Sequence, residues 1–112
     1  MPRCCLTLDL KDDPQLIAEY CEHHRTMWPE IVRSLKDSGI RELEIYLRGT
    51  RLFMVLDTVE GFSMEEKLRS DARDPKVCEW EELMWKYQQA LPRSKPGEKW
   101  QPMERIFKLS DV

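Results

Sequence analysis

The chain has 112 residues, of which 41% are hydrophobic and 35% charged, and its formal net charge is −3. This length fits one domain over residues 1–112, with a composition typical of globular proteins. Basic residues are scattered along the chain, which argues against nucleic acid as a partner. No apolar run approaches the ~20 residues of a membrane-spanning helix, so we expect no membrane partner.

The N-terminal third predicts a strand and then a long helical region. Leucines alternate with polar residues over 3–10, which is the period-two pattern of a half-buried strand. Asp12 or Asp13 is placed to cap a helix whose first turn contains Pro14. Apolar residues at steps of one, three and four predict that this amphipathic helix continues to near Gly39. Pro29 lies inside it and either kinks the helix or splits it in two.

The middle of the chain predicts a β-hairpin. Residues 40–48 and 51–58 both alternate between apolar and polar side chains, and only Gly49 and Thr50 separate them. Two short runs then indicate helices: one over 64–69, capped by Ser63, and one from Asp74-Pro75 to about Ala90. The apolar pattern of residues 103–109 predicts a last strand.

These elements follow one another in the order β-α-β-β-α-β. This order is typical of the ferredoxin-like α+β fold, in which an antiparallel four-stranded sheet carries both helices on one face. Because the other face of such a sheet is left uncovered, we expect a homodimer of the dimeric α/β barrel type.

The four cysteines indicate a reducing compartment. Cys4, Cys5, Cys21 and Cys78 form no CxxC pair, and no signal peptide follows the first residues. Free thiols and a cytoplasmic location are therefore expected. The two histidines and these cysteines lack the ligand spacing of a zinc site, so we expect no bound metal.

His24 is the strongest candidate for chemistry. Helical geometry places Tyr20, His24 and Trp28 on one face, whereas His23 lies about 100° away and is expected to face solvent. Periodicity alone favours a hydrogen-bonded core histidine over a catalyst. The neighbouring rings favour a sugar site, because sugars combine apolar faces with hydroxyls that need donors and acceptors.

Two residues of the second predicted helix are weaker candidates. Trp80 either faces the same space as His24 or is a core aromatic residue. Glu81 is either a surface carboxylate or, if it faces inward, a partner for a hydroxyl and a second acid–base group.

Residues 20–31, with Tyr20, His24 and Trp28-Pro29-Glu30, resemble the L-rhamnose mutarotase family, and the likeness extends over nearly the whole chain. The resemblance implies a dimeric ferredoxin-like enzyme that interconverts the α and β anomers of a 6-deoxyhexose. It implies His24 as the general acid–base group and Tyr20 as a sugar-binding residue. The reaction needs no metal or cofactor, because a group that titrates near neutral pH suffices.

Two positions depart from the family pattern. The family's pair of tryptophans maps to Trp80-Glu81, so only the first is kept, and a family tyrosine aligns with Leu43. Both departures fall where hydroxyls are recognised, so they leave the choice of sugar open. Residues 97–100 and 80–85 resemble a branch of the family linked with L-fucose rather than L-rhamnose. A non-catalytic ligand-binding module and a small cofactor-free monooxygenase remain alternative functions, because fold alone does not fix function.

Overall fold

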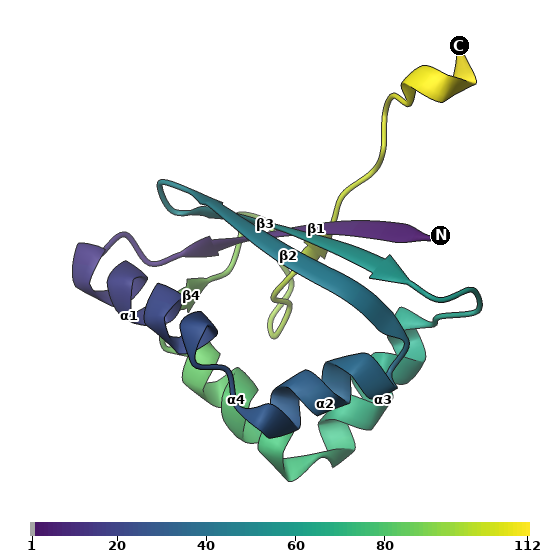
Figure 1. Ribbon diagram of the computed structural model, residues 1–112. Coiled ribbons are helices and arrows are strands. Elements are labelled where there is room, and N and C mark those ends of the chain that lie inside the picture. Colours follow the sequence, from purple (N-terminus) through teal and green to yellow (C-terminus); the bar gives the residue numbers. More distant parts are fainter. Residues whose placement is uncertain (1) are drawn as a thin grey trace.

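The computed structural model describes residues 2–112 as a sheet with helices on one side (Figure 1). Its elements are β1 (Arg3–Leu10), α1 (Pro14–Arg25), α2 (Pro29–Asp37), β2 (Ile40–Arg48), β3 (Arg51–Thr58), α3 (Met64–Arg73), α4 (Pro75–Trp85), β4 (Gln88–Gln89), β5 (Gln101–Pro102) and a final 3-10 turn (Leu109–Asp111).

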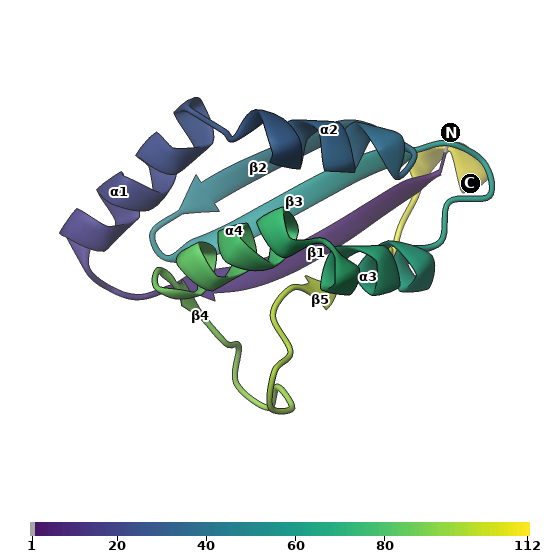
Figure 2. The same ribbon diagram turned by 90° about the horizontal axis from the view of Figure 1, so that it is seen from below.

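The sheet has the strand order β2-β3-β1-β4, and the short β5 also pairs with β1. All pairings are antiparallel. Figure 2 shows α1, α2, α3 and α4 spread over the same face of the sheet. The predicted α+β fold of the ferredoxin-like type is therefore confirmed. Within residues 2–112, no helix is long and apolar enough to span a bilayer.

Strand alternation builds the inner face of the sheet. Leu8 of β1 lies opposite Leu52 of β3, and Leu43 of β2 lies opposite Leu56. Leu8, Leu52 and Leu56 are almost completely buried beneath the helices. The period-two pattern read from the sequence is thus the pattern of burial, and burying such side chains provides most of the driving force for folding.

The predicted long helix is split into α1 and α2. Trp28 is extended (φ −64°, ψ 132°), and Pro29 is the first residue of α2. Proline has no amide hydrogen for the preceding turn and disfavours a helical conformation at the residue before it. Of the two outcomes expected for Pro29, the structure shows the break.

The predicted end of the second helix, at about Ala90, is wrong. α4 ends at Trp85, and the following residues pair with the first strand. Gln88 lies opposite Leu10 in the β1–β4 pairing, and Lys11 N–H donates to the Tyr87 carbonyl (2.9 Å). Sheet hydrogen bonding therefore replaces the helix over these residues.

The predicted strand over 103–109 is also wrong. The short β5 lies just before it, with Thr7 opposite Gln101 and Leu6 opposite Pro102. Because β5 runs antiparallel to β1, residues beyond Pro102 approach the beginning of β1 at Arg3. Only a few residues of β1 therefore remain for them to pair with. The chain beyond Met103 leaves the sheet and extends away from the domain, ending in a single 3-10 turn (Figure 1).

Candidate functional site

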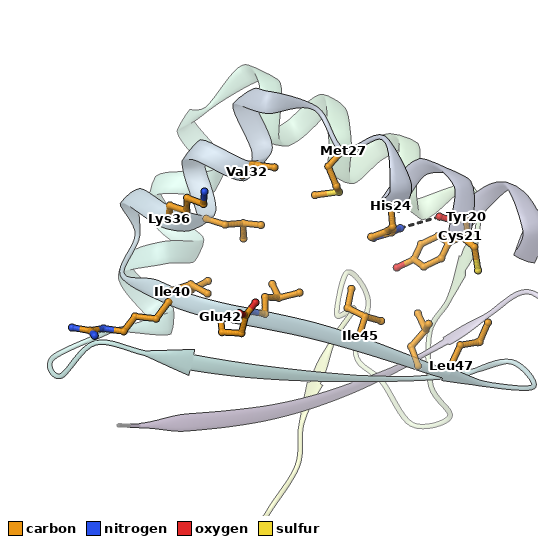
Figure 3. A pocket seen from close by; sticks show the side chains of 14 residues that line it. Tyr20, Cys21, His24, Met27, Val32, Lys36, Ile40, Glu42, Ile45 and Leu47 are labelled. Carbon is orange, nitrogen blue, oxygen red and sulfur yellow. Dashed lines mark hydrogen bonds between the residues drawn. The ribbon is translucent and has the colours of Figure 1, made fainter.

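Two adjoining cavities lie between the sheet and the helices. The outer cavity, about 470 Å³, opens between the α1–α2 region and the edge strand β2 (Figure 3). The inner cavity, about 100 Å³, lies deeper, against α4. Six residues line both cavities: Tyr20, His24, Met27, Leu35, Leu43 and Ile45. The outer volume lies in the range of small-molecule sites. Tyr20 and His24 lie at one end of it, and Lys36 and Glu42 lie away from them (Figure 3).

His24 is held in one orientation by the backbone of its own helix. Its Nδ1 lies 2.9 Å from the carbonyl oxygen of Tyr20, one turn earlier. A carbonyl only accepts hydrogen bonds, so Nδ1 carries the hydrogen and Nε2 has a free lone pair. No residue within 2–112 hydrogen-bonds Nε2, and Figure 3 shows the ring pointing into the cavity. His24 is therefore arranged as a proton acceptor.

Burial adjusts the protonation of both polar residues of the pair. Desolvation lowers the pKa of His24 below its ordinary 6.5, against the opposing effect of the Tyr20 carbonyl. Desolvation raises the pKa of Tyr20 to about 12. Their ring centroids lie 4.5 Å apart. At neutral pH the cavity therefore presents a neutral imidazole base beside a protonated phenol.

Trp80 forms the wall behind His24. Its side chain is 5% exposed, lines the inner cavity and meets the His24 ring edge-on with centroids 5.7 Å apart. Trp28 packs against the other side of Trp80, at 5.2 Å and 71°. Trp28 lines neither cavity, so the structure gives it a supporting position, and its predicted contact with a sugar stays a prediction.

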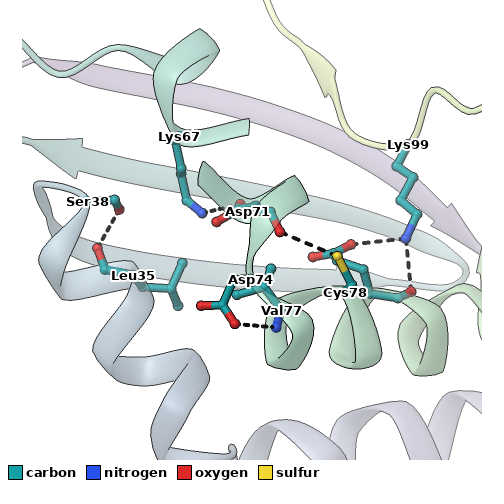
Figure 4. A network of polar contacts seen from close by, with 9 residues as sticks. Leu35, Ser38, Lys67, Asp71, Asp74, Val77, Cys78 and Lys99 are labelled. Atoms are coloured by element: carbon teal, nitrogen blue, oxygen red, sulfur yellow. Dashed lines mark hydrogen bonds and ion pairs between the residues drawn. The ribbon is translucent and has the colours of Figure 1, made fainter. Parts of the chain in front are cut away.

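Glu81 lines the inner cavity, next to Trp80 on α4. Its carboxylate pairs with Lys99, whose Nζ lies 3.0 Å from Oε2 and 2.9 Å from the Glu81 carbonyl oxygen (Figure 4). The contact with Lys99 holds this carboxylate in place, and its oxygens can accept hydrogen bonds. The two predicted roles of Glu81, as a hydroxyl partner and as a second acid–base group, stay predictions.

Known proteins of one family are similar to this chain. Residues 3–109 match the profile of the family described as L-rhamnose mutarotase. This chain belongs to the L-rhamnose mutarotase family. Because a mutarotase is a sugar isomerase, the predicted enzyme class is confirmed along with the predicted family.

Curated relatives of this family carry two sugar names. An L-fucose mutarotase of Xanthomonas campestris pv. campestris is 50% identical over all of this chain and 91% of its own length. An L-rhamnose mutarotase of Acidiphilium cryptum is 31% identical over 87% of this chain and 89% of its own length. The crystal structure of an L-rhamnose mutarotase from Formosa agariphila superposes with a TM-score of 0.71 at 24% identity, covering 96% of this chain and 98% of that one. This last likeness shows the shared fold.

The prediction that His23 faces solvent is wrong. His23 is half-buried against α4 in this mutarotase-family chain, with its Nε2 3.1 Å from the Tyr87 hydroxyl. That hydroxyl donates to a Glu19 carboxylate oxygen at 3.1 Å, so His23 donates to Tyr87. The step from His24 to His23 turns the side chain toward the neighbouring helix, and helical periodicity alone does not show where that helix lies.

Two groups of polar residues that line the inner cavity were not predicted from the sequence. Gln88 of β4 is buried, and its Nε2 donates to the Tyr20 hydroxyl (3.3 Å). Lys67 and Asp71 of α3 form a largely buried ion pair of 2.6 Å (Figure 4). Gln88 falls where the sequence predicts a helix, and the Lys67–Asp71 spacing is that of an ordinary surface helix pair. No local signal distinguishes these residues from surface residues.

Proposed function

We propose that this chain interconverts the α and β anomers of a 6-deoxyhexose. The observation that carries the proposal is the fixed tautomer of His24, with a free Nε2 lone pair facing a sugar-sized cavity beside Tyr20. Family membership supports the same activity. The aliphatic lining around Leu35 and Ile45 suits the methyl group that distinguishes a 6-deoxyhexose from its parent sugar.

The reaction is a proton transfer that opens and closes the sugar ring. His24 Nε2 takes the proton of the anomeric hydroxyl, the bond between C1 and the ring oxygen breaks, and the imidazolium returns the proton to the ring oxygen. The C1 carbonyl group of the open chain then rotates about the C1–C2 bond. The same steps in reverse close the ring with attack on the other face of C1. Tyr20 keeps its proton, since its pKa is about 12, and donates a hydrogen bond to the sugar.

L-fucose is the sugar that we propose as the preferred substrate. The relative named L-fucose mutarotase is 50% identical over the whole chain, against 31% for the L-rhamnose mutarotase compared above. Leu43 lines both cavities and Glu81 lines the inner one, so both departures from the rhamnose pattern face the substrate space. The two sugars differ in the configuration of ring hydroxyls, which are the groups that such positions contact.

A polarimetric assay tests the activity. Freshly dissolved single anomers of L-fucose and L-rhamnose relax to equilibrium on their own, and we expect the protein to accelerate L-fucose more strongly. A sugar-binding module would bind the sugar and leave the relaxation rate at its protein-free value. Oxygen uptake with a quinol would indicate the monooxygenase alternative, which family membership does not favour.

The pH dependence of the reaction follows from the state of His24. The base must be neutral, and burial lowers its pKa below 6.5, so activity should be full at neutral pH and fall only below pH 6.5. Catalysed relaxation, corrected for the protein-free rate at each pH, is measured from about pH 4 to about pH 9. A midpoint above 6.5, or a rate that rises on acidification, would contradict this assignment.

We also propose that the protein is a cytoplasmic homodimer. All four cysteines are free, as expected in a reducing compartment.

The C-terminal arm (residues 103–112) carries apolar side chains that have no cover within the described residues of one chain, with Ile106 92% and Leu109 74% exposed. Tyr46, on the outer face of the sheet, is 54% exposed. A second copy would cover both surfaces, and a one-chain mass by sedimentation equilibrium at micromolar concentration would refute the dimer.

A further inference from the structure

The side-chain amide of Gln88 has an unused hydrogen-bonding group next to the candidate site. Gln88 is 3% exposed and lines the inner cavity, and its Nε2 donates to the Tyr20 hydroxyl (3.3 Å). Its Oε1 is buried and has no hydrogen-bond partner within residues 2–112. Leaving such a group unpaired is unfavourable, and most buried polar atoms are paired. Turning the amide by 180° would still leave one of its atoms unpaired.

Tyr20 has an unused group on the same side. Its hydroxyl oxygen accepts from Gln88, and no residue within 2–112 accepts its hydrogen. Tyr20 lines both cavities, and its ring lies 4.5 Å from that of His24. Together the two side chains therefore present one donor and one acceptor, side by side, at the inner end of the space that begins at His24. A pair of neighbouring hydroxyls on a pyranose offers the complementary pattern.

We propose that the Gln88 amide hydrogen-bonds a ring hydroxyl of the bound sugar and helps to determine which sugar is accepted. The hydroxyl would satisfy the unpaired amide atom, while Gln88 keeps the Tyr20 hydroxyl oriented toward the same sugar. This inference rests on the proposed function and deepens it by naming a specificity residue. A site that hydrogen-bonds a hydroxyl discriminates strongly against analogues that lack it.

Thr58 provides a matched control within the same chain. Its Oγ1 is the other buried side-chain atom without a hydrogen-bond partner in the described residues, and Thr58 is 1% exposed. Thr58 ends β3 and lines neither cavity. Both positions therefore share burial and an unpaired oxygen, and they differ in whether the residue lines the candidate site.

The test compares Gln88→Met and Thr58→Val with the wild-type chain. Methionine keeps the approximate length of glutamine and removes its polar atoms. Dissociation constants and anomer-exchange kinetics are measured for L-fucose and for a set of monodeoxy L-fucose analogues, each lacking one ring hydroxyl. We expect Gln88→Met to weaken L-fucose binding by roughly 2- to 12-fold, which corresponds to one neutral hydrogen bond. Gln88→Met and the wild-type chain should bind one of the analogues equally well. This analogue lacks the hydroxyl that Gln88 contacts, so the hydrogen bond is already absent in the wild-type complex.

Thr58→Val should leave all affinity ratios unchanged. If Gln88→Met retains the wild-type ratios for every analogue, the amide contacts no sugar hydroxyl and the inference is wrong. Circular dichroism and urea unfolding show whether each variant folds; if Gln88→Met does not, Gln88→Leu is measured in its place. If the wild-type chain binds L-fucose in a Gln88-dependent way without accelerating anomer exchange, the proposed function fails while the binding role of Gln88 stands.

Discussion

Replacing His24 with alanine is expected to slow catalysed anomer exchange by roughly 10²- to 10⁴-fold, the usual contribution of a positioned acid–base group. The reason is geometric: Nδ1 is committed to the Tyr20 carbonyl, so the free Nε2 is a neutral base directed into the cavity around Tyr20. The rate is measured by polarimetry on L-fucose after subtraction of the protein-free rate.

His23→Ala is the matched control for this experiment. His23 is adjacent in sequence and half-buried, but it is held by Tyr87 and lines neither cavity. We expect it to keep the wild-type rate within a few fold. Added imidazole should restore part of the activity of folded His24→Ala by replacing the missing base. Equal rates for wild type and His24→Ala would remove His24 from the mechanism.

Trp80→Ala should cost about 3–5 kcal/mol in the free energy of unfolding, the range for a tryptophan removed from a core. Trp80 is 5% exposed, and its ring contacts His23, His24 and Trp28 with centroids 5.2–6.4 Å apart. Its removal leaves a void behind His24 that these neighbours fill only in part. Urea unfolding at neutral pH gives the free energy, provided that the transition is two-state.

Trp85→Ala on the same helix serves as the control. Trp85 is 37% exposed, and Lys99 Nζ lies 5.0 Å from the centre of its ring. An exposed cation–π contact is worth about 0.5–1 kcal/mol, so the loss should be much smaller than for Trp80. Similar losses for the two variants would mean that Trp80 is not the buried wall that the structure shows.

The parts of the fold that local patterns determine were predictable from the sequence. The strand over 3–10 and the hairpin around Gly49 follow from period-two alternation and a two-residue turn. The split at Pro29 was one of two stated outcomes, and proline chemistry explains it. His24 was placed on the inward helix face by periodicity, and the family resemblance gave it a role.

The parts that tertiary pairing determines were not predictable. Nothing between Trp85 and Ala90 breaks a helix locally, yet Gln88 leaves it to pair with Leu10 of β1. The apolar residues beyond Met103 have the alternation of a strand, but only Arg3 and Cys4 of β1 remain for them to pair with. The buried environment of Gln88 follows from its pairing with β1. The sequence therefore pointed to His24, the proposed acid–base group, and gave no sign of Gln88 beside it.

Anomer exchange at equilibrium tests the central claim most directly, because it needs no variant and no starting anomer. The anomeric proton of α-L-fucose is saturated in an NMR experiment, and transfer to the β anomer is followed with catalytic amounts of the wild-type chain. We expect transfer well above the protein-free level at neutral pH, with loss of the effect below pH 6.5 as His24 is protonated. If L-fucose binds and the transfer stays at its protein-free level, the chain binds the sugar without exchanging its anomers, and the account is wrong.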